Sequence, residues 1–387
     1  MQKYVVSCIL HFISYVIIFC KLAFMRILLL ILLSVPCIGF SSDFENIDLN
    51  DSLESVFSIS AQQHYGFIII HSRAIRAIKN SYPIGTEFNF NWQKIDKTSW
   101  DLCHCYPRFG GVVSFFDFDN KDILGYGFNV AGFVEPFFRT DKKLNISFRI
   151  VAGLSLATKP YDENTNPENL SYSLPVNEYS QLGIIFHYKI NPKFKATFST
   201  NYNHISNGGL KQPNKGINYP TLGVGLDYTP NPISFNAREK TDFKGVKKRR
   251  YDLSISYFPK KIISNSRYFT VFGVSTGLSQ QIGRISALTF DVEYVWDHSL
   301  EWRLEQLNED KNFFRGGGLV GHEFLMGSFT FSQKLGVYIY DILKYDDPLY
   351  QKYGINFHAT ENIFIGLHIK AHRHVADFML VKLGWTF

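Results

Sequence analysis

The last nine residues, MLVKLGWTF (379–387), carry an apolar side chain at every second position and end on an aromatic residue. The apolar series consists of Met379, Val381, Leu383, Trp385 and Phe387. A period of two is that of a β-strand, in which successive side chains point to opposite faces. The chain therefore ends in a predicted strand with one continuous apolar face.

The same alternation dominates the chain from about residue 64. It is clear in EFNFNW (87–92), LNISFRI (144–150) and DLSISY (252–257), where apolar and polar residues take turns. A soluble sheet that packs on a core shows this pattern, and so does a barrel wall that faces lipid. Alternation alone leaves both architectures open.

Composition, segment length and turn spacing favour the membrane barrel. Charged residues make up only 19%, against 36 Phe and 22 Tyr, and aromatic girdles with an apolar outer wall are typical of transmembrane barrels. Many alternating segments run for about 10–14 residues, close to the span of a tilted transmembrane strand. Connections are tight near residues 191–192, 283–284 and 360–361 and long at 157–178, 298–317 and 341–352.

These features predict an all-β chain that forms a transmembrane antiparallel outer-membrane β-barrel. We expect roughly 12–16 strands and favour about 14. The final strand resembles the carboxyl-terminal signal that the barrel assembly machinery recognises, which implies that machinery as a partner and puts Phe387 on the periplasmic side. The long loops then fall outside. The connection 230–248 is long yet periplasmic, which indicates either a further hairpin or a slip in register.

The amino-terminal segment indicates export. Met25-Arg26 precedes LLLILLSVPCIGF and then SSDFEN, which is the order of a basic start, an apolar stretch and a cleavage region. We predict a signal segment at 1–42 with its true start at Met25, a periplasmic acidic tail at 43–63 and the barrel at 64–387. An uncleaved anchor over 4–40 and a lipoprotein at Cys37 are the alternatives, the second disfavoured by Pro36.

The sequence offers little support for nucleic-acid binding or for a metal site. The formal net charge of +6 is partly due to the leader, so no nucleic-acid partner is expected. Cys103 and Cys105 suit neither a disulfide framework nor a zinc site, so we expect structural cysteines, with an oxidised or metal-touching pair as the alternative. The histidines of HIKAHRH (368–374) could seat a metal, but solvated rim histidines are the favoured interpretation. We expect no metal and no cofactor.

The candidate chemistry lies in NYNHISNGGLKQPNKGINYP (201–220). In the strand before the turn, even-numbered residues form the more apolar face, which puts His204 and Ser206 on the lipid-facing wall. Asn218 has the matching parity in the next strand, subject to a bulge at Pro220. Polar groups on that surface are costly and need a reason. A serine beside a histidine is the minimum apparatus for acyl transfer.

This stretch resembles the outer-membrane lipid A 3-O-deacylases, also described as acyloxyacyl hydrolase-like barrels. Their His-x-Ser-Asn-small-Gly pattern followed by Pro-Asn is present as HISNGG (204–209) and PN (213–214). The resemblance implies that Ser206 is the nucleophile and His204 the general base. It implies oxyanion contacts from Gly209, Asn214 and Asn207.

This chain departs from the family in two respects. The acidic triad member is expected at position 218, where this chain has Asn218, which can orient a histidine but carries no charge. Another carboxylate such as Asp227 is the alternative. The family's smaller members also use about eight strands, and this chain has room for far more.

The predicted function is a carboxylic-ester hydrolase of the bacterial outer membrane. Its substrate would be lipid A of lipopolysaccharide or a related glycolipid among the outer-membrane lipids, with the site at the outer leaflet. The alternatives are a non-enzymatic pore, adhesin or structural barrel with a relic motif, and a phospholipase.

Overall fold

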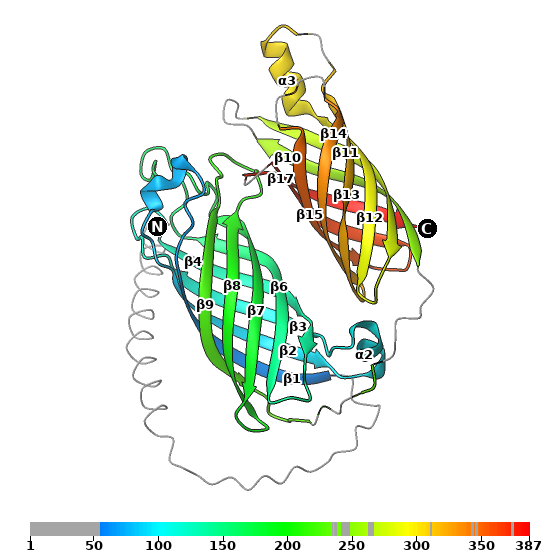
Figure 1. The fold of residues 1–387 in the computed structure, drawn as a ribbon. Helices are drawn as coiled ribbons and strands as arrows, with labels where there is room; N and C mark the ends of the chain where they lie inside the picture. The colour runs from blue at the N-terminus through cyan, green and yellow to red at the C-terminus, as the bar shows by residue number, and fades with distance from the viewer. Residues whose placement is uncertain are drawn as a thin grey trace, which may run out of the picture. The chain divides into compact units, whose positions relative to one another are not determined.

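The computed structural model describes residues 55–233, 235, 238–240, 248–261, 267–309, 312–341, 344, 347–372 and 375–387. The predicted signal segment, and the tail up to residue 54, lie outside these residues. Within them, no helix is long and apolar enough to cross a bilayer. Almost all regular structure is antiparallel sheet (Figure 1).

The first sheet holds nine strands in the order β4-β3-β2-β1-β9-β8-β7-β6-β5, and pairing between β4 and β6 closes it. β5 is a two-residue extension beside β6, so the wall is an eight-stranded barrel. The strands are β1 (Ser55–Gly66), β2 (Ile84–Lys94), β3 (Arg108–Asp117), β4 (Tyr126–Glu135), β5 (Phe137–Phe138), β6 (Leu144–Ala157), β7 (Val176–Lys189), β8 (Phe194–Ser206) and β9 (Ile217–Tyr228).

The second sheet is a separate closed barrel in which every strand pairs with its sequence neighbour and β10 pairs with β17. Its strands are β10 (Arg249–Lys261), β11 (Tyr268–Gln281), β12 (Ser286–Asp297), β13 (Phe314–Met326), β14 (Phe329–Tyr340), β15 (Leu349–His358), β16 (Ile363–His372) and β17 (Val375–Thr386). The helices among the described residues lie between strands: η1 (Arg73–Ile78), α2 (Lys97–Cys103) and α3 (His298–Gln306).

The prediction of an all-β barrel protein is confirmed, but the prediction of one barrel of about 14 strands is wrong. The described strands form two barrels of eight, at the upper end of the expected range. The long connection at 230–248 is the segment between the barrels, so neither a hairpin nor a register slip is needed to explain its length. The predicted acidic tail is also too long, because β1 already begins at Ser55.

The alternation in sequence is an alternation between lipid and barrel interior. On β8, Phe198 and Tyr202 are exposed on the outer wall, whereas Ser199, Asn201 and Asn203 are buried inside. Eight strands enclose a lumen that side chains fill completely. Polar groups inside must therefore find partners in one another.

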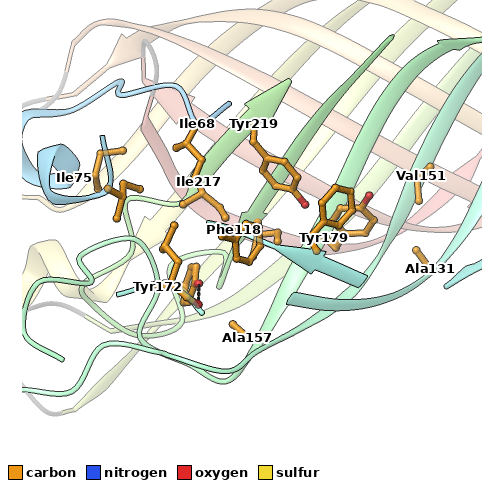
Figure 2. Close-up of a cluster of buried hydrophobic side chains, with 14 of the residues drawn as sticks. Ile68, Ile75, Phe118, Ala131, Val151, Ala157, Tyr172, Tyr179, Ile217 and Tyr219 are labelled. Carbon is orange, nitrogen blue, oxygen red and sulfur yellow. Dashed lines mark hydrogen bonds between the residues drawn. The ribbon is translucent and has the colours of Figure 1, made fainter. Parts of the chain in front are cut away.

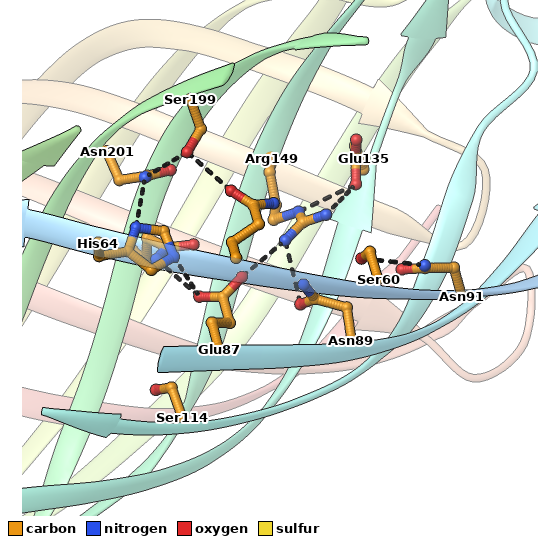
Figure 3. A network of polar contacts seen from close by, with 12 residues as sticks. Ser60, His64, Glu87, Asn89, Asn91, Ser114, Glu135, Arg149, Ser199 and Asn201 are labelled. Carbon is orange, nitrogen blue, oxygen red and sulfur yellow. Dashed lines mark hydrogen bonds and ion pairs between the residues drawn. The ribbon is translucent and has the colours of Figure 1, made fainter. Parts of the chain in front are cut away.

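Arg149 is the centre of the polar network inside the first barrel (Figure 3). Its guanidinium donates to Glu135 Oε2 at 2.8 and 2.9 Å and to Glu87 Oε1 at 3.1 Å. It also donates to Asn89 and lies over the ring of Phe133. Both carboxylates and the arginine are buried. This network ties β2, β4 and β6 together across the lumen.

An apolar cluster fills the lumen towards the end where β8 passes into β9 (Figure 2). It contains Ile68 and Ile75 from the β1–β2 connection, Tyr172 from the β6–β7 connection, and Ile205, Ile217 and Tyr219 beside the β8–β9 turn. Burial raises the pKa of Tyr172, whose hydroxyl donates to the Leu124 carbonyl. The close packing of this cluster makes that end of the barrel rigid.

The interior of the second barrel is likewise filled by ion pairs. Glu293 accepts hydrogen bonds from Tyr350, Lys352 and Lys370, and Lys334 pairs with Asp291 and Glu323. In the described part of each barrel, buried and paired side chains therefore occupy the lumen.

Two expectations about isolated residues need correction. Cys103 and Cys105 form a disulfide, with a Cα–Cα distance of 5.0 Å, so the oxidised alternative is the one observed. The expectation of solvated histidines in 368–374 is wrong where it can be examined. His368 is buried and lies 2.8 Å from Asn356 Oδ1, and His372 is buried against Asp377; His374 lies outside the described residues.

Removal of the central arginine should destabilise the first barrel strongly. Arg149→Ala leaves Glu87 and Glu135 as buried carboxylates without their cation, at a cost of about 3–5 kcal/mol. The thermal midpoint, measured by heat-modifiable gel mobility in detergent, should fall clearly. Lys97→Ala, which removes an exposed pair with Asp101, should leave it unchanged. Equal shifts for the two variants would contradict this account of the interior.

Candidate active site

The three residues of the predicted site come together on the outer wall of the first barrel. β8 and β9 pair in continuous register, with His204 directly opposite Asn218 and no bulge at Pro220. On the other side of β8, Ser206 lies opposite Glu178 of β7. Residues that face each other across an antiparallel pair have their Cβ atoms about 4.5–5.5 Å apart. The register therefore gathers these side chains on one patch of the wall.

His204 and Asn218 form a direct hydrogen bond. His204 Nδ1 lies 2.6 Å from Asn218 Oδ1, so the ring donates from Nδ1 and keeps its lone pair on Nε2. This is the tautomer that a general base needs. The register and this bond fix both the position and the protonation pattern of the imidazole.

Ser206 is buried beneath the turn that follows it, with an exposed fraction of 5%. Its Oγ accepts a long hydrogen bond of 3.4 Å from the Gly208 N–H. No hydrogen bond between Ser206 and His204 is present in this part of the described chain. Such contacts often tighten only when substrate is bound, and the two residues lie two apart on the same face of β8.

Gly216 occupies the space between the two side chains. A Cβ atom added there would lie 2.9 Å from His204 Cε1 and 3.4 Å from Ser206 Cβ, and its φ is +69°. A glycine at this position therefore serves two needs, since it permits the left-handed backbone and leaves the gap between His204 and Ser206 unfilled.

The Asn207 side chain holds the turn 207–216 in shape. Its Oδ1 accepts from the Gly209 N–H at 3.0 Å and its Nδ2 donates to the Lys211 carbonyl at 2.7 Å. Its own N–H donates to Asn214 Oδ1 at 2.9 Å. The turn is also bonded to the β6–β7 connection, because the Gly216 N–H donates to the Ser171 backbone carbonyl.

The residues expected to contact the oxyanion have different hydrogen-bond partners. The N–H groups of Gly209 and Asn207 are used within the turn. The Gly208 N–H points at Ser206 Oγ. Asn214 Oδ1 is engaged, which turns its Nδ2 away from Asn207. Of the N–H groups in the turn, that of Gly208 is therefore the one in contact with Ser206 Oγ.

Asp227, the alternative acid, lies inside the barrel and away from the wall. It is fully buried and pairs with Arg108 at 2.8 Å, so it belongs to the interior network. Among the described side chains, no group of three or more His, Cys, Asp or Glu could hold a metal ion.

Two residues near the site were not singled out from the sequence. Glu178 lies opposite Ser206, and its Oε2 is buried with no hydrogen-bond partner among the described residues. His71, after the end of β1, lies 3.3 Å from Asn218 Nδ2. His71 continues the odd-numbered, lipid-facing series of β1 that includes Tyr65 and Phe67. That parity was visible in the sequence, but the pairing of β1 with β9 was not.

Two family models match the chain in sequence. Residues 80–227 match the model of the lipid A 3-O-deacylase (PagL), and residues 245–387 match that of the acyloxyacyl hydrolase C-terminal domain. The chain belongs to the lipid A 3-O-deacylase family. The first match covers most of the barrel that carries His204, Ser206 and Asn218, and the second covers the other barrel. As a family member with outward-facing apolar walls, the protein is an outer-membrane acyl hydrolase.

Solved structures add little to this assignment. Pseudomonas aeruginosa OccK5 (OpdH) shares 8% identity over 86% of this chain and 97% of its own, with a TM-score of 0.24. A mutant porin of Rhodopseudomonas blastica shares 6% identity over 86% and 100%, with a TM-score of 0.19. No curated protein matches this chain in sequence.

Gly216→Ala should impair hydrolysis without unfolding the barrel. The added methyl group meets His204 Cε1 at 2.9 Å in a left-handed backbone conformation, so the imidazole must move from its place beside Ser206. Misplacement of a catalytic group by about 1 Å can cost on the order of 100-fold. Acyl-ester hydrolysis by purified protein measures the loss. The same substitution at Gly327, a turn glycine of the second barrel that also has a positive φ but nothing within 4 Å of the added atom, is the control, and equal losses would contradict the assigned role.

Proposed function

We propose that this protein removes an ester-linked acyl chain from lipid A, or from a related outer-leaflet glycolipid, by a Ser206–His204 mechanism. The observation that carries the proposal is the 2.6 Å hydrogen bond between His204 Nδ1 and Asn218 Oδ1, next to Ser206 on a lipid-facing wall. Ionisable residues on a membrane-facing surface are costly and commonly mark functional sites.

In the proposed reaction, His204 Nε2 takes the proton of Ser206 Oγ as the oxygen attacks the acyl carbonyl carbon. The tetrahedral oxyanion is stabilised by Gly208 N–H and Asn214 Nδ2. Its collapse breaks the ester bond, and His204 returns the proton to the departing sugar hydroxyl. A water molecule, deprotonated by His204, then attacks the acyl-serine and releases the fatty acid and Ser206.

Asn218 acts in this scheme by orientation alone. Its Oδ1 holds the Nδ1–H of His204, as in Cys-His-Asn enzymes, but it offers no negative charge to the imidazolium that forms. Asp227 cannot supply this charge to the wall, because it is paired to Arg108 inside the barrel. Glu178, opposite Ser206 and facing the same side, is the carboxylate placed to contribute to the local field.

The position of the site suits a lipid substrate. Tyr202 on β8 and Leu222 on β9 are exposed on the same wall, which offers an apolar surface for acyl chains. If Phe387 lies on the periplasmic side, as proposed from the final strand, the alternation of strands would bring the β8–β9 turn to the outer leaflet, where lipid A is found. The filled interior of both barrels speaks against the pore alternative.

Ser206→Ala should abolish deacylation, with a loss on the order of 1,000-fold or more, because the nucleophile is gone. His204→Ala should be nearly as severe, and the double variant no worse than the worse single one, since the two residues act as a unit. Asn218→Ala should cost about 10- to 100-fold, because only orientation of the base is lost. Mass spectrometry of lipid A incubated with each purified variant measures the acyl loss.

Thr200→Ala, on the same wall further along β8, is the matched control and should retain activity. Full activity of Ser206→Ala on lipid A would show that the motif is not the active site. A parallel incubation with glycerophospholipids separates the phospholipase alternative, and a wild type inactive on both lipids would support the non-enzymatic alternative.

A further inference from the structure

An asparagine at position 218 creates a difficulty that an acid would not. A carboxylate presents two equivalent acceptor oxygens, whereas an amide has one acceptor and one donor group. If the Asn218 amide turned over, its Nδ2 would face His204, and the histidine would have to accept at Nδ1 and carry its proton on Nε2. That tautomer cannot take a proton from Ser206. Some group must therefore fix the orientation of the amide.

We propose that His71 is a positioning residue that fixes the Asn218 amide and, through it, the catalytic tautomer of His204. This inference rests on the proposed function. His71 Nδ1 lies 3.3 Å from Asn218 Nδ2, and His71 Nε2 lies 2.9 Å from the Lys215 carbonyl oxygen. A carbonyl only accepts, so Nε2 carries the proton, and Nδ1 is left as an acceptor for Asn218 Nδ2–H.

The opposite tautomer of His71 fits less well. His71 Nδ1 also lies 3.3 Å from the Ile69 carbonyl oxygen, and a proton on Nδ1 would satisfy that contact but neither of the contacts to Lys215 and Asn218. It would set the Nε2 lone pair against the Lys215 oxygen at 2.9 Å and an N–H against the Asn218 N–H. The tautomer with the proton on Nε2 satisfies two contacts, including the shortest, and is the one that the geometry favours.

The backbone brings His71 to this place. Beyond the end of β1 the chain continues alongside β9. The Phe67 N–H donates to the Pro220 backbone carbonyl at 3.3 Å, and the Ile69 N–H donates to the Asn218 backbone carbonyl at 2.8 Å. His71 thus follows a segment tied to the residue that it orients. The result is a directed chain of hydrogen bonds from the Lys215 carbonyl through His71 and Asn218 to His204.

A double-mutant comparison with Asn218→Asp tests this role. Aspartate has the shape of asparagine but no amide to turn over, so it should make His71 dispensable for orientation. In the wild-type background, His71→Leu should lower kcat for lipid A deacylation by about 3- to 10-fold, the effect of one lost hydrogen bond, with KM little changed. In the Asn218→Asp background, the same substitution should change kcat by less than about 2-fold.

His71→Asn is the conservative variant, because its Oδ1 can accept from Asn218 in place of the ring Nδ1, and it should recover most of the activity lost in His71→Leu. Arg73→Ala, an exposed residue of the same connection, is the matched control and should behave as wild type. A purely structural role for His71 would give the same loss in both backgrounds, and that result would overturn the proposal.

A second readout is independent of activity. In protein labelled with ¹³C and ¹⁵N at histidine, NMR in detergent should show His204 as the Nδ1–H tautomer in wild type and as a mixture in His71→Leu. An unchanged tautomer in that variant would reject the role of His71 even if the wild type proved inactive. If the wild type is inactive on lipid A but the His204 tautomer still changes in His71→Leu, the proposed function is rejected and the role of His71 stands.

Discussion

Closure of eight antiparallel strands into a narrow barrel is the constraint on which the rest of this structure depends. The lumen has room only for side chains, and every second residue must point into it. Its buried charges are compensated by partners, as Arg149 is by Glu87 and Glu135. A lipid substrate cannot enter such an interior. Any chemistry on lipids must therefore take place on the outer wall.

The outer wall imposes its own conditions on a catalytic site. A polar side chain that faces lipid must be hydrogen-bonded and supported, because unpaired polar groups there are costly. Turn 207–216, braced by Asn207, and the adjoining connections supply this support at the edge of the wall. The use of Asn218 in place of an acid removes a charge from this apolar surface. The amide must then be held in one orientation, and in the proposed scheme the contact between Asn218 Nδ2 and His71 Nδ1 holds it.

The local features of the structure could be predicted from the sequence. Strict alternation predicted the wall, its parity placed His204, Ser206 and Asn218 on the lipid side, and the motif predicted their roles. Closure was not predictable in the same way. Alternation has the same period in one barrel of 14 strands as in two of eight, and the long connection 230–248 was ambiguous until the pairing of β1 with β9 was known. His71 and Glu178 were missed because both reach the site through strand pairings, and a local pattern carries no such information.

Covalent trapping of the nucleophile tests the central claim most directly. A long-chain fluorophosphonate reacts with a serine only when a neighbouring base activates it. The account predicts that intact-mass analysis of the purified protein will show a single adduct and that peptide mapping will locate it on Ser206, with no adduct in Ser206→Ala and little in His204→Ala. An unlabelled wild type, or an adduct on another residue that persists in Ser206→Ala, would contradict it.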